Sequence, residues 1–406
     1  MGPRAPFFIS YMPKQKIYTL QFGLLCLSSL LFFSSFNMII PDMYDFLTDL
    51  GGEQYKGYII SLFTITAGLS RPFSGKLSDT IGRIPVMVIG AGVCVLAGLT
   101  YPMIGSVFAL LLLRFVNGFA TGFKPTGTAA YVADIIPADR RGEAMGIIGI
   151  FGSTGMALGP YLGPKVTQWF SLDVTFYTSS TLAFLSVAIL LGMKETLPNK
   201  VKFSPKLLAI KMDEIIEPRV FNPSILFMLT SFSFGMGLTL MPDLTMSVGY
   251  AEADKGVFFL TFVLSSLAVR VIAGKVSDRY GRVVVLKYAT IAIVIADLMV
   301  AFTTTQSMLI ISSIVFGVAV GMNTPTIYAW TIDLSLEKAR GKGLATMYIA
   351  LEIGIGLGAF IGGYIYANEV ANMKYAFITG AVLSFAAFLF LNFGLSWTRK
   401  FVKESA

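Results

Sequence analysis

Runs of about twenty mostly apolar residues recur twelve times along this chain of 406 residues. A helix rises about 1.5 Å per residue, so roughly 20 residues are needed to cross about 30 Å of hydrocarbon. Since hydrocarbon offers no water to a free peptide group, each run must be helical. The chain is therefore predicted to be an all-α integral membrane protein with twelve transmembrane helices. The predicted spans are residues 17–40, 57–75, 84–104, 107–133, 142–166, 173–193, 223–245, 256–275, 283–303, 307–332, 342–366 and 375–397.

The composition supports this interpretation and excludes several functions. Only 13% of the residues are charged, against about 25% in soluble domains. There is no histidine, which excludes imidazole-based metal sites, catalysis and proton relays. Cys26 and Cys94 lie in apolar runs and are expected to pack without forming a disulfide. Because no paired catalytic carboxylates, metal-ligand cluster or nucleotide-binding loop appears, we expect no enzyme activity, no metal and no cofactor.

The basic residues predict the orientation in the membrane. Of the 31 lysines and arginines, 23 lie in segments on the side of the N-terminus, four lie in loops on the opposite side, and four lie within helices. Cytoplasmic loops carry the excess of basic residues, so both termini are predicted to be cytoplasmic. The net charge of +8 is thereby explained without a nucleic-acid partner. The compact loops favour a bacterial inner (plasma) membrane.

One long polar insertion, residues 194–222, separates a predicted N-terminal bundle (1–193) from a C-terminal bundle (223–406). Between Lys206 and Ile216, leucine and isoleucine alternate with charged residues at a spacing that suits an amphipathic helix on the cytoplasmic surface. A plain flexible linker is the alternative.

The two halves carry an internal repeat. The segment Arg71–Arg83 (RPFSGKLSDTIGR) aligns with Arg270–Arg282 (RVIAGKVSDRYGR) at an offset of 199 residues. Because six helices separate the copies, the two bundles have the same orientation and form a parallel repeat. The same offset relates Lys56-Gly57 to Lys255-Gly256, Asp134 to Asp333, Gly155 to Gly354, Gly159 to Gly358 and Gly163 to Gly362, while Pro41-Asp42 matches Pro242-Asp243 at an offset of 201.

The chain resembles the major facilitator superfamily of transporters over nearly its whole length, and its drug:proton antiporter branch in particular. The family's loop signature, roughly G-x-L-[SA]-D-x-x-G-R-[KR], is present from Gly75 to Arg83 and again from Gly274 to Arg282. The first copy departs from it at Thr80 and Ile84, where basic residues are common. The resemblance implies two six-helix bundles that alternate access to a central cavity.

The resemblance also implies that the two loop copies act as gates. Asp79 is expected to face the positive end of a helix from the other half, and Arg83 is expected to pair with Asp134. Alternatively, these charges only mark the orientation. The predicted gating residues are Gly75, Asp79, Gly82, Arg83, Asp134, Gly274, Asp278, Gly281, Arg282 and Asp333.

Span 5 resembles the family's antiporter signature, G-x-x-x-G-P-x-x-G-G, with Pro164 in place of the last glycine. Gly155, Gly159 and Gly163 form a smooth face for close helix contact, and Pro160 permits a bend. In the family this pattern is enriched in exporters that exchange substrate for protons. Ordinary packing of small residues is the alternative.

Without histidine, a coupled proton must be carried by a carboxylate. Glu352 ranks first because it lies in the middle of span 11, where the repeat has Ser153 and symmetry does not require an acid. Asp42 and Asp243 follow, near the outer ends of spans 1 and 7. They are candidates for binding protons or for acting as hydrated gate residues.

Span 4 contains two cations that suggest a substrate pathway. Burying an arginine such as Arg114 costs at least about 2.5 kcal/mol, so it should face the interior. Lys124 lies about 15 Å further along the helix, where it would bind an anionic group or neutralise a carboxylate of the other half. The predicted cavity residues are these two with Asn117, Phe36, Met38, Phe115, Phe119, Phe234, Met236 and Tyr328.

These features predict a secondary active transporter, and the favoured hypothesis is proton-coupled efflux (antiport) of small amphipathic organic compounds, as in multidrug exporters. One alternative is a carrier of an anionic metabolite or chelator that uses Arg114 and Lys124. Another is a membrane receptor or scaffold that transports nothing. The expected partners are the lipid bilayer, a small-molecule substrate and protons, and the protein is expected to be a monomer.

Overall fold

The computed structural model describes residues 19–137, 140–209, 215–335 and 340–395, and these residues are mainly helical. The first half contains α1 (Leu20–Met38), α2 (Ile40–Asp49), α3 (Tyr58–Thr80), α4 (Arg83–Thr100), α5 (Val107–Asn117), α6 (Phe119–Ile135), α7 (Arg141–Trp169) and α8 (Leu172–Leu191). The second half contains α10 (Phe221–Ser247), α11 (Val257–Tyr280), α12 (Arg282–Ala301), α13 (Gln306–Leu334), α14 (Arg340–Tyr366) and α15 (Met373–Leu389).

Local sequence signals explain where many of these helices begin and break. Ser106, Ser171 and Thr305 are N-caps, and each side-chain oxygen accepts a hydrogen bond of 3.3 Å from the backbone N–H three residues further on. Pro41 stands in the first turn of α2, where its missing N–H costs nothing. A break at Gly118 separates α5 from α6 within one span.

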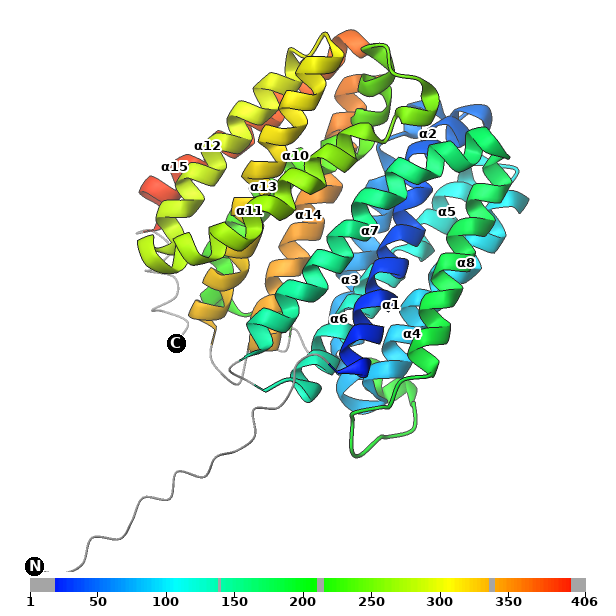
Figure 1. Ribbon diagram of the computed structural model, residues 1–406, viewed down its shortest axis with the longest axis vertical. Helices are drawn as coiled ribbons and strands as arrows, with labels where there is room; N and C mark the ends of the chain where they lie inside the picture. Colours follow the sequence, from blue (N-terminus) through cyan, green and yellow to red (C-terminus); the bar gives the residue numbers. More distant parts are fainter. Residues whose placement is uncertain (1–18, 138–139, 210–214, 336–339, 396–406) are drawn as a thin grey trace, which may run out of the picture.

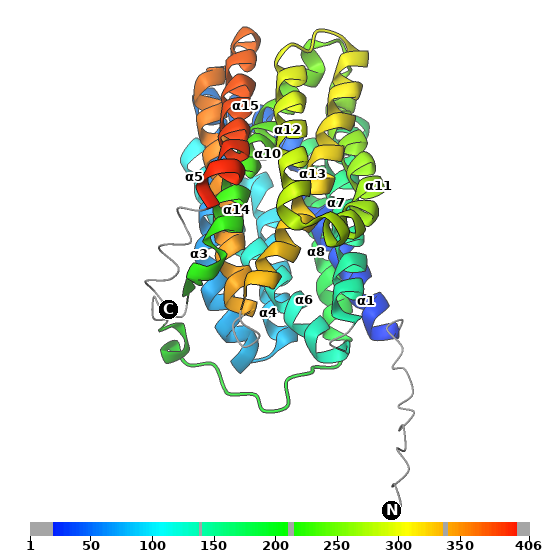
Figure 2. The same cartoon turned by 90° about the vertical axis from the view of Figure 1, so that its left-hand side faces the viewer.

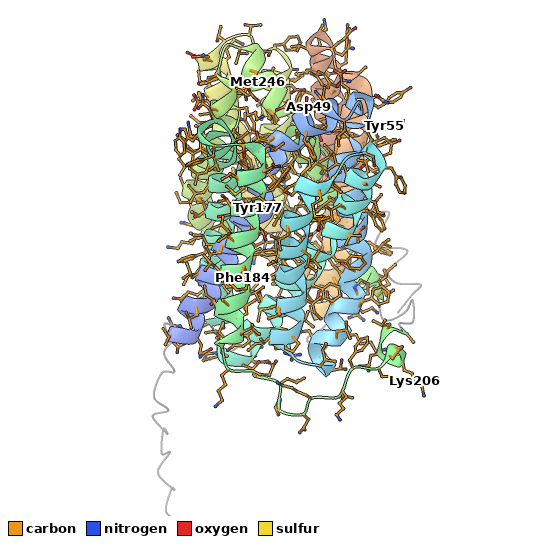
Figure 3. All side chains as sticks on the ribbon, turned by 90° about the vertical axis from the view of Figure 1, so that its right-hand side faces the viewer. Asp49, Tyr55, Tyr177, Phe184, Lys206 and Met246 are labelled. Atoms are coloured by element: carbon orange, nitrogen blue, oxygen red, sulfur yellow. The ribbon has the colours of Figure 1, made fainter. Side chains whose placement is uncertain are left out.

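Ten of the described helical segments are long and apolar enough to cross a membrane. An eleventh is formed by the bent pair Glu252–Arg270 and Ile272–Tyr280, which meet at 45°. The remaining long helix is α3, in which Arg71 and several hydroxyl residues lower the mean hydropathy. Counted with α3, the described helices give the twelve predicted spans. Tyr177 and Phe184 lie on the flank of the molecule (Figure 3) and are 47% and 58% exposed, as expected for side chains that face lipid.

The helices form two bundles that stand side by side (Figure 1). The packing in one bundle repeats in the other: α1 packs on α7 and α8, and α10 packs correspondingly on α14 and α15. Two helix pairs join the bundles, α3 with α14 and α7 with α11, and these pairs are also related by the repeat. The arrangement is the all-α membrane fold with a parallel repeat that the sequence predicts.

The connection between the bundles runs along one end of the molecule (Figure 2). Its described part contains two short 3-10 helices, Pro205–Leu208 and Pro218–Val220. Lys76 of α3 donates a hydrogen bond of 2.5 Å to the carbonyl oxygen of Ala209, which ties the connection to the first bundle. Residues 210–214 of the predicted amphipathic helix lie outside the described residues, so that hypothesis stays a prediction.

Two glycines close the tight turns at the equivalent ends of α3 and α11. Gly82 has φ +126° and ψ 157°, and Gly281 has φ +92° and ψ 145°. Essentially only glycine adopts this backbone region without strain. The surroundings differ, because a Cβ on Gly82 would meet the Glu195 carboxylate whereas a Cβ on Gly281 would meet nothing within 4 Å.

We therefore predict that Gly82→Ala and Gly281→Ala both lower the thermal unfolding temperature of the purified protein in detergent, by the equivalent of about 1–3 kcal/mol of backbone strain. Gly82→Ala should lower it further, because it also displaces Glu195. An equal effect of the two substitutions would contradict the packing described around Gly82.

Candidate functional site at the seam between the two halves

The seam is the contact surface between the bundles, formed by α3 against α14 and α7 against α11. Following the predicted orientation, we call the end that carries Lys56 and Lys255 the outer end and the end that carries Arg83 the inner end. The predicted coupling and gating residues lie along this seam or beside it, at three depths.

At the outer end the two halves touch through backbone atoms. Gly57, next to the start of α3, is so close to α14 that a Cβ would lie 2.7 Å from the Ala359 carbonyl oxygen. Its repeat partner Gly256, next to the start of α11, abuts the Pro160 carbonyl oxygen of α7 in the same way. Ala359 and Pro160 are themselves separated by 199 residues. The antiporter-like motif of α7 is therefore part of a symmetric outer closure.

The lysines that precede these glycines cross the seam reciprocally. Lys56 of the first half forms an ion pair of 2.9 Å with Asp243 of the second, and Lys255 of the second half forms one of 2.7 Å with Asp42 of the first. The Lys255 side chain is only 1% exposed and also reaches Asp45 at 2.5 Å. Asp42 and Asp243 thus serve as anchors of a closed outer end in this conformation.

A third ion pair, Lys165 with Asp254 at 2.6 Å, joins the halves beside the α7 and α11 contact. Tyr44 adds a hydrogen bond of 2.8 Å from its hydroxyl to the Leu238 carbonyl oxygen across the seam. Backbone contact, charge pairing and hydrogen bonding therefore all close the outer end.

At mid-depth, Arg71 of α3 and Glu352 of α14 form an ion pair with an Nη2 to Oε1 distance of 2.6 Å. The two side chains are 6% and 9% exposed. The Arg71 guanidinium also lies 4.2 Å from the centre of the Tyr348 ring. Sequence reasoning singled out Glu352 but missed Arg71 as its partner, although the repeat had marked Arg71 as a charge within a helix.

Glu352 also lines a groove of about 900 Å³ along the α3 and α14 contact. The groove is largely apolar, and Ile65, Leu69 and Leu357 on its walls are 49%, 62% and 45% exposed. Thr64 and Ser224 add hydroxyl groups to the lining. The groove thus combines an apolar surface with one acidic residue, Glu352, in its lining.

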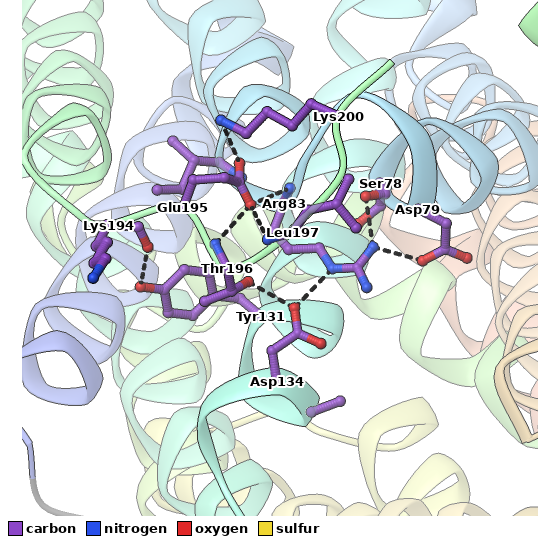
Figure 4. Close-up of polar contacts among 12 residues, drawn as sticks. Ser78, Asp79, Arg83, Tyr131, Asp134, Lys194, Glu195, Thr196, Leu197 and Lys200 are labelled. Carbon is purple, nitrogen blue, oxygen red and sulfur yellow. Dashed lines mark hydrogen bonds and ion pairs between the residues drawn. The ribbon is translucent and has the colours of Figure 1, made fainter.

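At the inner end the charged loops form ion pairs within their own halves, and Figure 4 shows the network of the first half. Arg83 forms the predicted ion pair with Asp134 at 3.0 Å and a second with Asp79 at 2.6 Å. In the other half, Arg282 pairs in the same way with Asp333 at 2.9 Å and with Asp278. Glu195, which sequence reasoning missed, accepts hydrogen bonds from the Arg83 and Ile84 backbone N–H groups and caps α4.

Among the described residues, Asp79 forms no ion pair with the opposite half. Its side chain is 72% exposed and pairs with Arg83 of the same half, whereas the sequence led us to expect the positive end of a helix across the seam. Asp278 is similarly 65% exposed. In the described part of the chain, every ion pair across the seam lies at the outer end or at mid-depth. The molecule is thus closed outside, with both loop networks undocked inside.

The glycines of α7 and α14 serve helix packing. Gly155, Gly159 and Gly163 are so close to α1 that a Cβ on each would lie within 3 Å of a backbone oxygen of α1. Gly354 and Gly358 approach α10 in the corresponding way. By contrast, a Cβ on Gly75 or Gly274 would meet nothing within 4 Å, so these two loop glycines have no close neighbour here.

The predicted cavity cations lie inside the first bundle. Arg114 is 0% exposed, donates from Nε to the Ile59 carbonyl oxygen at 3.1 Å and lies 4.7 Å from the Phe63 ring centre. Lys124 is also 0% exposed and donates to Ser29 Oγ at 2.7 Å. The partners found for both among the described residues belong to the first half, and Arg71 is the cation that meets Glu352.

The other predicted cavity residues are scattered, and the groove at α3 and α14 is lined by different side chains. Asn117, Phe36, Met38 and Met236 are buried, whereas Phe119 is 38% exposed. The remaining three, Phe115, Phe234 and Tyr328, are half-buried.

The sequence matches a known protein family over most of the chain. The family model described as Major Facilitator Superfamily matches residues 25–240 and 223–405. The chain therefore belongs to the major facilitator superfamily, and it is a multi-pass membrane protein and a secondary transporter of small molecules.

Among curated relatives, a multi-drug resistance efflux pump PmrA homolog of Lactococcus lactis is 27% identical over 381 residues, covering 87% of this chain and 91% of the relative. The multidrug resistance protein MdtG of Escherichia fergusonii is 26% identical over 357 residues, covering 82% and 85%. The solved structure of the human organic anion transporter MFSD10 (TETRAN) has a TM-score of 0.71 at 18% identity, covering 91% of this chain and 98% of that chain. This last similarity concerns the fold alone.

The outer ion pairs predict a measurable shift in conformation. Lys255→Gln removes the partner of the buried Asp42 carboxylate and should open the outer end, because an unpaired buried charge costs about 3–5 kcal/mol. Spin labels at the exposed positions Gln54 and Ala371, one in each half, should show longer distances by double electron–electron resonance.

Lys374→Gln provides the matched control, since Lys374 is an exposed lysine at the same end. An unchanged distance distribution in Lys255→Gln would show that these pairs do not hold the outer end closed.

Proposed function

We propose that this transporter exports small amphipathic organic compounds in exchange for protons, with Glu352 as the coupling carboxylate. The observation that carries the proposal is the buried ion pair of 2.6 Å between Arg71 and Glu352, which joins the halves beside an apolar groove. The relative described as a multi-drug resistance efflux pump supports the direction of transport, and it supports the substrate class together with the multidrug resistance protein MdtG.

The ion pair gives a physical reason for coupling. If the halves separate at α3 and α14, Arg71 moves away from Glu352 and leaves a carboxylate in a site of low polarity. Breaking a buried pair in this way costs about 3–5 kcal/mol. A proton that neutralises Glu352 removes most of this cost, so the separated state binds a proton and the paired state releases it. Conformational change and proton movement are then linked.

The groove gives the substrate a place near the same pair. An amphipathic compound buries apolar surface against residues such as Leu69 and Leu357, while its polar group lies near Thr64 or Glu352. Burial stabilises such a ligand by roughly 25 cal/mol per Å² of apolar surface, without requiring a particular shape. This suits a transporter that accepts compounds of varied structure.

Asp42 and Asp243 receive a different role in this proposal. Both are bound to lysines of the opposite half. They act first as closing contacts, and they become accessible from outside when the outer end opens. The exported compound would leave as these pairs part.

The proposal predicts that Glu352→Gln abolishes proton coupling, because glutamine keeps the shape of the side chain but binds no proton. In proteoliposomes, addition of ethidium should acidify or alkalinise the lumen of vesicles with the wild-type protein, according to protein orientation. The variant should lose at least about nine-tenths of this proton movement.

Glu252→Gln is the matched control, since Glu252 has a side chain 73% exposed at the outer surface, and it should behave as the wild type. Ethidium-driven proton movement of normal size in Glu352→Gln would rule out Glu352 as the coupling group.

A further inference from the structure

Arg270 of α11 is the repeat partner of Arg71, but it lacks the partner that Arg71 has. Arg71 pairs with Glu352, and the residue 199 positions before Glu352 is Ser153. Ser153 is buried and offers a hydroxyl group in place of a carboxylate. The second copy of the seam therefore has an arginine, Arg270, but a serine at the position that corresponds to Glu352.

The surroundings of Arg270 offer weak compensation for its charge. In the described part of the chain Arg270 forms no ion pair, and its Nε donates a long hydrogen bond of 3.4 Å to Ser266 Oγ. It lies ten residues before the inner end of α11, so roughly 15 Å from that end. An unpaired guanidinium at this depth costs at least about 2.5 kcal/mol, and intramembrane charges of this kind mark ligand pathways.

Two tyrosines lie near Arg71, and the second of them is also near Arg270. The Tyr348 ring stands 4.2 Å from the Arg71 guanidinium, and its centre is 5.4 Å from the centre of the Tyr328 ring. Tyr328 is near enough to both Arg71 and Arg270 for their charges to act on its hydroxyl. Arg71, Tyr348 and Tyr328 are thus joined by successive ring contacts, with Glu352 paired to Arg71.

Accessibility separates Arg270 from the other cations within helices. Arg114 and Lys124 are 0% exposed, and Arg71 is 6% exposed with its charge already paired. Arg270 is half-buried. Among these four cations it is therefore the one that is neither fully buried nor paired with a carboxylate among the described residues.

We propose that Arg270, with Tyr328 and Tyr348, binds a carboxylate group carried by an aromatic compound that this transporter moves. A planar guanidinium donates two parallel hydrogen bonds to a carboxylate, and the tyrosine rings supply an aromatic surface beside it. The ligand carboxylate takes the place that Glu352 has beside Arg71. The inference rests on the proposed export function and adds a substrate class to it.

Two fluorescent probes test this assignment, dansylglycine and its uncharged analogue dansylglycinamide, which differ only in the carboxylate. Their binding is measured by fluorescence titration with the purified full-length protein in detergent. A hydrogen bond to a charged group contributes about 1.5–3 kcal/mol, and 1.4 kcal/mol corresponds to a factor of ten. The wild type should therefore bind the acid at least about tenfold more tightly than the amide.

Two variants should remove this preference by opposite routes. Arg270→Gln deletes the cation, and Ser153→Glu supplies the missing internal carboxylate while Arg270 stays in place. In both, the affinity ratio of acid to amide should fall to about one. Arg279→Gln, an exposed arginine on the same helix, is the matched control and should retain the wild-type ratio.

Wild-type protein that binds both probes equally, or not at all, would overturn the inference, and so would an Arg270→Gln variant that keeps the wild-type ratio. Such a result would leave the proposed function intact if ethidium still drives proton movement through the wild-type protein. Absence of that proton movement would instead contradict the proposed function, whichever probe binds.

Discussion

The ion pair between Arg71 and Glu352 is the buried charge contact between the two halves on which the proposed coupling depends. Its two partners come from different halves, 281 residues apart in the sequence, and both are buried. In a site of low polarity neither charge can be left alone without a cost of about 3–5 kcal/mol. The halves cannot move apart here without this cost unless a proton neutralises Glu352, or a substrate charge or another side chain replaces the lost partner. A packing contact would impose no such condition, because it has no protonation state.

The contacts at the outer end agree closely with the internal repeat, whereas the charged residues at mid-depth do not. At the outer end, Lys56 with Asp243 mirrors Lys255 with Asp42. The adjacent glycines contact α14 and α7 at positions that also correspond in the repeat. The two sides of the seam are therefore closed by corresponding contacts. At mid-depth, the acid is present on one side only, so Arg71 is paired with Glu352 whereas Arg270 has no carboxylate partner among the described residues.

Much of the fold could be predicted from the sequence, because hydrocarbon forces apolar runs of fixed length to be helical and the repeat fixes the relation of the halves. The Arg83 and Asp134 pair was also predictable, since both residues belong to one half and recur in the second copy as Arg282 and Asp333. The partner of Glu352 was not, because a sequence does not show which of several buried cations faces a given helix.

Other features could not be predicted because they depend on how the helices pack and on the conformation, which the type of a side chain does not reveal. The reciprocal lysines were visible as a repeated Lys-Gly pair, but only the packed structure shows that each crosses to the opposite half. The exposure of Asp79 depends on the conformation, which a sequence does not specify. Aromatic residues such as Phe36 and Phe119 suit a cavity, a lipid surface or a core equally well, so composition could not distinguish these positions.

The most direct test of the central claim is to observe the Glu352 carboxyl group in each conformation by infrared difference spectroscopy. The rings of Tyr58 and Phe360 are 5.2 Å apart across the seam, so cysteines at these positions can be cross-linked to hold the outer end closed. With the cross-link intact, Glu352 should be ionised and give no protonated carboxyl band. Reduction of the cross-link should produce such a band, and Glu352→Gln should abolish it. A protonated Glu352 in the cross-linked protein, or no change on reduction, would contradict the account.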